Sequence, residues 1–156
     1  MTPTPAGVTV IIPTWNRADL LDEVLRNVAA QTHRPAEVIV VDNGSTDESV
    51  AVAQRTGARV IALPRNRGFA FAVNRGIESS PTEWVLILNN DVRLRQDWLE
   101  RIMAAVAVEN TWFACGKLLV QNEPTVIDGT FDAVSRGGTA WRCGNGRADG
   151  PIWNER

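Results

Sequence analysis

The sequence is poor in residues that bind metals through nitrogen or sulfur, and its basic residues are not gathered into a stripe. It holds one histidine and two cysteines in 156 residues. Cys115 and Cys143 are too few for a disulfide framework or a zinc site, and we expect both to be reduced thiols in a cytosolic protein. The net charge of −2, with both signs scattered along the chain, gives no basic stripe and argues against a nucleic-acid partner.

Long hydrophobic runs are also missing. No run approaches the ~20 apolar residues that a membrane span needs, and the first seven residues lack the basic start and apolar core of a signal peptide. We therefore expect a cytoplasmic protein that contacts a membrane at most peripherally, at its inner face. A chain of 156 residues with 44% hydrophobic content is long enough for one domain, 1–156, and short for two.

Apolar runs alternate with helical stripes over residues 8–120. The runs at 8–12, 38–41, 59–63, 84–88 and 113–120 predict strands, and the stripes between them predict helices, the first from about Ala18 to Gln31. Ser45 and Glu48 have the spacing of a capping box for the second helix. This alternation favours an α/β fold with a mostly parallel sheet flanked by helices and right-handed crossovers. The unbroken run at 84–88 predicts a strand buried on both faces.

The alternation fades after Gln121. Residues 121–156 contain half of the 12 glycines and few aliphatic residues, which predicts an irregular segment with one short hairpin. A tail of this length without regular structure is uncommon inside a compact domain. It favours a chain cut before its natural end over a functional loop.

Polar clusters follow the first, second and fourth predicted strands, at 14–17, 42–47 and 89–91. The carboxyl ends of parallel strands share one edge of the sheet, so these clusters are expected to lie together there. Acceptors from Asp42 and Asp91, with backbone N–H groups at the helix starts, suit a nucleotide and its phosphates. Asp91 suits a divalent cation that bridges phosphate oxygens, and Arg67 could reach a phosphate.

Each cluster also has a purely structural interpretation. The tetrapeptide 42–45 fits a turn that leads into a capped helix, and 89–91 fits a loop that closes a strand. The tripeptide 66–68 fits a structural turn and helix start. Residue type and spacing alone leave these alternatives open.

Four motifs in order make the pattern specific. They are Val-Ile-Ile-Pro-Thr-Trp-Asn-Arg at 10–17, Glu-Val-Ile-Val-Val-Asp-Asn-Gly-Ser-Thr-Asp at 37–47, Asn-Arg-Gly-Phe-Ala-Phe-Ala-Val-Asn-Arg-Gly at 66–76, and Leu-Asn-Asn-Asp at 88–91. Together they resemble the family 2 glycosyltransferases of GT-A fold, whose first part is a Rossmann-like nucleotide-binding half. The resemblance implies a UDP- or dTDP-sugar donor, Mg²⁺ or Mn²⁺, a saccharide or glycolipid acceptor, and inversion at the anomeric carbon.

The resemblance also implies roles for single residues. Residues 13, 14 and 16 would line the nucleoside pocket, Asp42 would contact the base or ribose, and 89–91 stands at the family's Asp-x-Asp motif, whose metal would neutralise the departing diphosphate. The implied nucleotide-binding residues are Pro13, Thr14, Asn16, Arg17, Asp42, Asn43, Gly44, Arg67, Asn89 and Asn90, and the implied metal ligand is Asp91.

The sequence departs from the family pattern at two positions of the donor site. Asn89 is neutral where the family has an acid, which should weaken metal binding or shift it onto Asp91 and the phosphates; the Asn-Asn-Asp form is similar to a rhamnosyltransferase-like branch. Val73 stands where many members have an arginine for the diphosphate, so Arg67 or Arg75 would substitute.

A third departure concerns the general base that inverting transfer requires. In the family this base lies in a later acidic motif, and none of Asp128, Asp132 and Asp149 matches its position, so we assign no base. We expect residues 8–120 to be the nucleotide-sugar-binding core of a longer enzyme and 121–156 to begin its acceptor side. The alternatives are a non-catalytic nucleotide-sugar-binding module and a sugar-1-phosphate nucleotidyltransferase, although the first strand does not lead to the Gly-rich loop of the latter.

Overall fold

The structure is a computed structural model that describes residues 7–108, 111–130, 132–136 and 139–153. These residues fall into two compact units, Met1–Met103 and Ala104–Arg156. No helix in the described ranges is long and apolar enough to cross a membrane. The elements are β1 (Val8–Thr14), α1 (Ala18–Ala29), β2 (Glu37–Asp42), α2 (Ser49–Arg55), β3 (Arg59–Ala62), α3 (Phe69–Ser79), β4 (Trp84–Ile87), α4 (Trp98–Val106), β5 (Leu118–Val120), β6 (Glu123–Gly129), β7 (Asp132–Val134), β8 (Ala140–Arg142) and the 3₁₀ turn η1 (Pro151–Trp153).

The first unit is built on a four-stranded sheet in the order β3-β2-β1-β4. Every neighbouring pair is parallel, and Ile11 of β1 lies opposite Ile39 of β2 and Ile87 of β4. The prediction of a mostly parallel sheet flanked by helices is confirmed.

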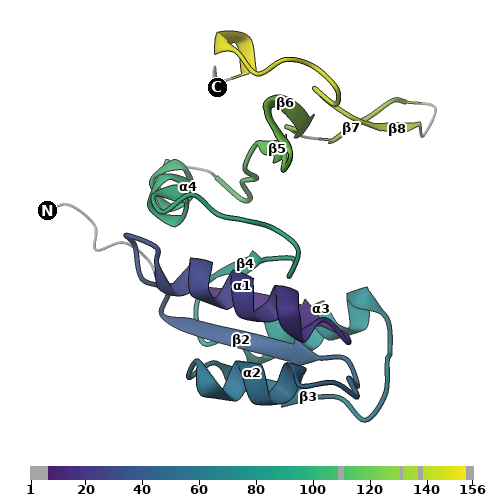
Figure 1. The fold of residues 1–156 in the computed structure, drawn as a ribbon. Helices are drawn as coiled ribbons and strands as arrows, with labels where there is room; N and C mark the ends of the chain where they lie inside the picture. Colours follow the sequence, from purple (N-terminus) through teal and green to yellow (C-terminus); the bar gives the residue numbers. More distant parts are fainter. Residues whose placement is uncertain (1–6, 109–110, 131, 137–138, 154–156) are drawn as a thin grey trace, which may run out of the picture. The chain divides into compact units, whose positions relative to one another are not determined.

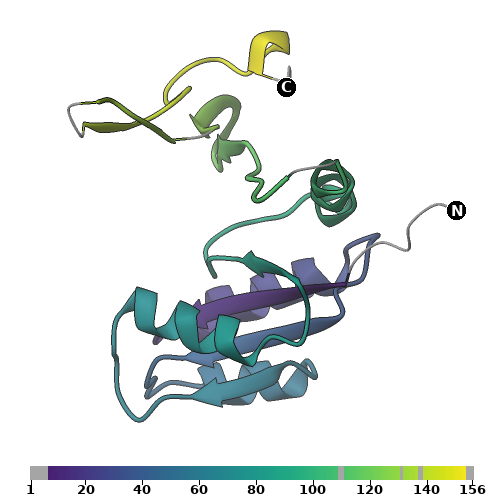
Figure 2. The ribbon, with the colours of Figure 1, turned by 180° about the vertical axis from the view of Figure 1, so that it is seen from behind.

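Helices cover both faces of this sheet (Figures 1 and 2). Successive residues of a strand point to opposite faces, so Val10 and Ile12 pack with α1 and α2, whereas Ile11 packs with Ala72 of α3. All four side chains are fully buried. Helix α3 comes very close to β1, because a Cβ on Gly76 would lie 2.4 Å from Cγ2 of Ile11.

The order of the strands places a change of winding direction beside β1. The chain moves outward from β1 to β2 and β3, then crosses back over the sheet through α3 and adds β4 on the other side of β1. Right-handed crossovers put α1 and α2 on one face and α3 on the other when the direction reverses. Open sheets of this kind bind ligands at the carboxyl ends of the strands where the winding reverses.

Strand β4 differs from its prediction. It lies at an edge of the four-stranded sheet, its side chains are partly exposed, and Ile87 is 44% exposed. The predicted burial on both faces is therefore wrong for this unit, because an apolar run does not distinguish a central strand from an edge strand. The predicted strand at 113–120 shrinks to β5, which pairs with β6 and does not join the parallel sheet.

The second unit contains two antiparallel pairs, β5 with β6 and β7 with β8. One short hairpin was predicted after Gln121, so the number of strands was underestimated. The β-branched residues at 125–127 suit β6, in which Ile127 is fully buried. Lys117 and Asp149 form an ion pair at 2.6 Å, and Cys115 and Cys143 are free thiols, as predicted.

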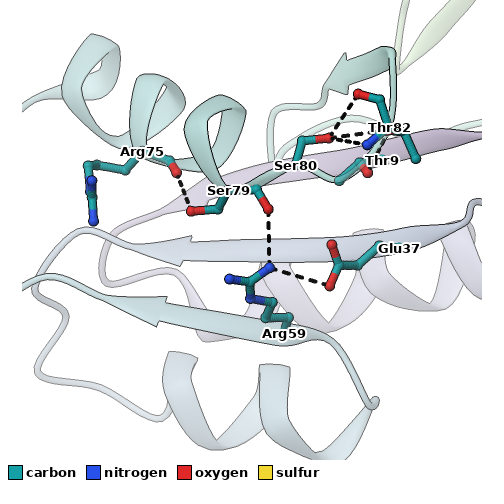
Figure 3. Close-up of polar contacts among 7 residues, drawn as sticks. All are labelled: Thr9, Glu37, Arg59, Arg75, Ser79, Ser80 and Thr82. Carbon is teal, nitrogen blue, oxygen red and sulfur yellow. Dashed lines mark hydrogen bonds and ion pairs between the residues drawn. The ribbon is translucent and has the colours of Figure 1, made fainter.

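The protein's own polar groups join the elements at the amino ends of the strands, as Figure 3 shows. Arg59 donates to the carbonyl oxygen of Ser79 at 3.1 Å and lies 3.7 Å from the carboxylate of Glu37. The hydroxyls of Thr9 and Thr82 are 2.8 Å apart. These contacts attach the end of α3 and the start of β4 to the sheet, at the end opposite the polar clusters.

Candidate functional site

The three polar clusters meet at Thr14, the last residue of β1. Thr14 is buried and lies opposite Asp42 in the register of β1 and β2. Its carbonyl oxygen accepts from the N–H of Asn43 at 2.8 Å, and its hydroxyl accepts from the side-chain amide of Asn90 at 3.0 Å. Thr14 thus bonds to the chain after β2 and to the chain after β4, at the change of winding direction.

Asp42 carries a buried oxygen that lacks a partner. The residue is 2% exposed, and its Oδ2 accepts from the N–H of Ser45 at 3.1 Å. Its Oδ1 is buried with no hydrogen-bond partner in the described structure. Leaving a buried acceptor unpaired costs about 1–3 kcal/mol. A ligand whose donor pairs with this oxygen would remove that cost.

The loop after β1 and the loop after β2 are bonded to each other. Asn16 has a positive φ of 50°, a conformation that asparagine tolerates better than most residues. Its N–H donates to Oγ of Ser45 at 2.9 Å, and its Oδ1 accepts from the N–H of Thr46 at 2.8 Å. The side chain of Asn16 therefore already serves to fix the second loop.

Asp47, rather than Ser45, bonds to the first residue of α2, whose N-cap residue Glu48 makes no side-chain cap bond. The predicted capping box is wrong because the hydroxyl of Ser45 accepts from Asn16 and the helix begins four residues later, at Ser49. Asp47 accepts from both the N–H and the hydroxyl of Ser49, at 3.0 and 2.6 Å, and from the N–H of Ala18 at the start of α1. The Ser49 hydroxyl is the main cause that lowers the pKa of Asp47 below its ordinary value, and the two backbone bonds add to this.

Asn43 holds the loop that leads into α3. It is 6% exposed, and its amide donates to Oδ1 of Asn66 and to the carbonyl oxygen of Gly68, at 3.0 and 3.2 Å. Its own oxygen accepts from the N–H of Arg67 at 2.8 Å. The guanidinium of Arg67 lies over the ring of Phe71, 4.2 Å from its centroid. The predicted turn and helix start at 66–68 is thus present, and Asn43 fixes it.

Three other predicted residues lie at the same edge. Pro13 is a partly buried residue of β1, and Arg17 is exposed, with its side chain 3.6 Å from the carboxylate of Asp19. Gly44 brings two loops into contact, since a Cβ there would lie 2.6 Å from the Cα of Arg65. All of the predicted residues therefore follow or end a strand at this edge.

The tripeptide 89–91 leaves two polar side chains unused. Leu88 before it is buried, and its N–H donates to the carbonyl oxygen of Ile11 at 2.9 Å. Asn90 bonds to Thr14, whereas Asn89 and Asp91 are exposed and have no hydrogen bond or ion pair with any described residue. One carboxylate and one amide oxygen are thus available to a ligand.

The described residues contain no group of three or more His, Cys, Asp and Glu side chains that could hold a metal. A cation at Asp91 would need its other ligands from water and from phosphate. Mg²⁺ sites commonly combine one or two carboxylates with substrate phosphates, so the oxygen donors present fit that chemistry.

Sequence reasoning missed the polar residues in and directly after α1 that lie against the chain after Asp91. Glu23, Asn27 and Gln31 all bond to residues between 93 and 99. The spacing of four residues places Glu23 and Asn27 on one side of the helix, and Gln31 continues that spacing past the end of the helix. That spacing was the available signal, but a polar stripe on a helix usually faces solvent.

Comparison with known proteins gives a consistent set of matches. The family model described as Glycosyl transferase family 2 matches residues 9–147. The succinoglycan biosynthesis protein ExoO of Rhizobium meliloti is 34% identical over 113 residues, which cover 66% of this chain and 32% of that protein. A PGL/p-HBAD biosynthesis glycosyltransferase of Mycobacterium tuberculosis is 32% identical over 131 residues, 80% of this chain and 51% of the relative.

The solved structures agree with these matches. The mannosyltransferase PcManGT of Pyrobaculum calidifontis, solved with GDP-Man and Mn²⁺, matches with a TM-score of 0.65 and 28% identity. The match covers 75% of this chain and 36% of that protein. The chain thus spans about a third to a half of the length of these three proteins.

Proposed function

Because the chain belongs to glycosyl transferase family 2, we propose that it binds a nucleotide-diphosphate sugar and takes part in transfer of the sugar, with inversion, to a saccharide or glycolipid acceptor. Family membership favours this reaction over nucleotidyl transfer to a sugar phosphate. ExoO is named for succinoglycan biosynthesis and the mycobacterial relative for PGL/p-HBAD biosynthesis, which supports a surface polysaccharide or glycolipid as the product. We place the reaction in the cytoplasm or at the inner face of the membrane.

One observation carries the proposal, namely the unpaired buried oxygen of Asp42 at the change of winding direction. A base N–H or a ribose hydroxyl can donate to this oxygen, and either would satisfy a group that the protein leaves unpaired. The neighbouring Thr14 and Pro13 form the end of β1 beside it. We assign this corner to the nucleoside.

We assign the diphosphate to the exposed groups next to the nucleoside corner. Asp91 would hold a divalent cation, with the Asn89 amide oxygen close in sequence as a neutral donor, and the cation would neutralise charge on the departing diphosphate. Arg17 and Arg67 are cations at the same edge that could contact phosphate oxygens. The Mn²⁺ in the solved mannosyltransferase supports a metal of this type.

Three predicted nucleotide-binding residues have a second role in this proposal. The polar groups of Asn16, Asn43 and Asn90 are engaged with other protein groups. We propose that these amides shape the pocket by fixing its loops, while Asp42 and Asp91 present oxygens to the ligand. Gly44 allows two of these loops to approach each other.

Isothermal titration calorimetry tests the proposal directly. UDP, dTDP and GDP are titrated into the chain with Mn²⁺ and with EDTA, and at least one should bind more tightly with the metal. Asp91→Ala should remove the metal-dependent part of the affinity. Asp22→Ala, which removes an acid of α1 paired with Arg26 at 2.8 Å, is the matched control and should bind as the unaltered chain does. Absence of binding for all three nucleotides would overturn the proposal.

A further inference from the structure

The segment that follows Asp91 lies along α1 and is bonded to it. We infer that Asn27 of α1 and Gln31, which follows the end of that helix, are positioning residues that hold the Asn89–Asp91 loop at the carboxyl edge of the sheet. The role of that loop in binding metal and nucleotide rests on the proposed function. The contacts with Asn27 and Gln31 do not.

Asn27 of α1 and Gln31 beyond its end bond to the backbone of this segment. The N–H of Leu94 donates to Oδ1 of Asn27 at 3.0 Å. Four residues further along the chain, the amide of Gln31 donates to the carbonyl oxygen of Arg95 at 2.8 Å, and its Oε1 accepts from the N–H of Leu99 at 2.9 Å. Asn27 and Gln31 thus pair the N–H groups of Leu94 and Leu99, and Gln31 shares the carbonyl oxygen of Arg95 with the N–H of Trp98.

Two more contacts extend this row in both directions. Glu23, one turn before Asn27, is ion-paired with Arg93. The N–H of Thr32 donates to the carbonyl oxygen of Gln96 at 2.9 Å. Glu23 and Asn27 are four apart on one side of α1, and Gln31 follows four residues later, past the end of the helix at Ala29. The segment therefore runs alongside the last turns of α1 and the chain directly after it.

Gln31 is buried, whereas Glu23 and Asn27 are only partly buried. Gln31 is 3% exposed, and an amide buried to this extent costs free energy unless its groups are bonded. All of its bonds go to Asn27 within α1 or to the segment after Asp91. The segment therefore cannot leave α1 without exposing or unpairing the side chain of Gln31.

These anchors act on Asp91 through the backbone. Its side chain has no partner in the described structure, so its position depends on where the chain is held on either side. The chain is held before it at Leu88, which bonds to Ile11, and after it at Leu94, which bonds to Asn27. Only a short stretch of chain lies between these two points, and the removal of one of them widens the range of positions that the carboxylate can reach.

Packing alone is the competing explanation for the order of the segment. Val92 and Leu94 are partly buried against the core formed with α1, and they would keep the segment near the helix without any polar contact. In that case Asn27 would be dispensable. The two explanations make different predictions for a pair of substitutions at this position.

Asn27→Asp and Asn27→Ala form a matched pair. Both remove the amide that donates to the carbonyl oxygen of Glu23, but only aspartate keeps an oxygen to accept from Leu94. Native-state hydrogen exchange of the chain should show faster exchange at residues 89–94 in Asn27→Ala, by about fivefold or more. Exchange there should be near the unaltered rate in Asn27→Asp, and the strands at 8–14 and 37–42 should not change in either variant.

Calorimetry with Mn²⁺ and the nucleotide that binds best gives a second measurement. Asn27→Ala should weaken the metal-dependent part of the affinity, leave the affinity in EDTA unchanged, and be rescued in Asn27→Asp. The inference is overturned if residues 89–94 exchange at the same rate in the two variants. It is also overturned if Asn27→Ala speeds exchange equally across the whole sheet. If the unaltered chain binds no nucleotide, the proposed function fails, while hydrogen exchange still decides whether Asn27 positions the loop.

Discussion

A methyl group added at Gly44 should force apart two loops of the candidate site. Gly44 has a φ of +78°, and a Cβ there would lie 2.6 Å from both the Cα and the carbonyl carbon of Arg65. Backbone atoms cannot rotate away as a side chain can, so one of the two loops has to move. The left-handed conformation costs a non-glycine residue about 1–2 kcal/mol, and overpacking adds about 1–3 kcal/mol. We expect Gly44→Ala to lower the free energy of unfolding by about 2–5 kcal/mol.

Gly57→Ala separates these two contributions. Gly57 has the same φ of +78°, but nothing lies within 4 Å of a Cβ built there. Urea unfolding should therefore show a loss of only about 1–2 kcal/mol for Gly57→Ala, with nucleotide affinity unchanged. Gly44→Ala should lose more stability and also bind nucleotide less tightly. If the two variants lose equal stability, the close approach of Gly44 and Arg65 is not a constraint and our reasoning fails.

Three further changes test single contacts. Asn43→Ala removes the bonds that its side chain makes to the 66–68 loop, and urea unfolding should show a loss of about 1–3 kcal/mol; an unchanged midpoint would contradict its role. The Ser49 hydroxyl lowers the pKa of Asp47 in the folded protein. The ionised Asp47 therefore stabilises the fold above its ordinary pKa of 3.8, and this stabilisation is lost as the pH falls through the lower pKa of the folded state. Urea midpoints measured from about pH 5 to about pH 3 should thus fall more steeply for the unaltered chain than for Asp47→Asn. Asn89→Asp adds a carboxylate beside Asp91 and should tighten Mn²⁺-dependent nucleotide binding in calorimetry, whereas weaker binding would place residue 89 away from the metal.

Local sequence patterns were sufficient for most of the first unit. The β-branched runs that became β1 and β2 are central and buried except for the partly buried Val38, and the stripe over α1 matches its buried residues, for example Leu21 and Val24. Prediction failed where the outcome depends on tertiary neighbours. The run at 84–88 reads as a buried strand, yet Ile87 is 44% exposed, because position within a sheet is a property of strand order. Short antiparallel strands such as β7 and β8 carry too few residues to show a period.

The candidate site was predictable as a location more than as a set of contacts. Parallel strands bring the ends of β1, β2 and β4 to one edge, and the motif order indicated those ends. The bonds among them were not predictable, since Ser45 fits the capping spacing but bonds to the N–H of Asn16, while Asp47 bonds to Ser49 at the start of α2. The contribution of α1 was also missed, because Asn27 and Gln31 look like part of a solvated face.

The unused polar groups distinguish the side chains that shape the site from those available to a ligand. An amide whose donors and acceptor are already paired, as in Asn43, gains little from a ligand and loses a protein contact if it turns. The buried Oδ1 of Asp42 and the exposed carboxylate of Asp91 have no such partners among the described residues. Both follow strands that flank β1, one on each side, and Thr14 at the end of β1 is tied to the residue after Asp42 and to the residue before Asp91. In our proposal the distance between the nucleoside contact at Asp42 and the metal contact at Asp91 is therefore set through the hydroxyl and carbonyl oxygen of Thr14, and a change in the register of the sheet should weaken nucleotide binding.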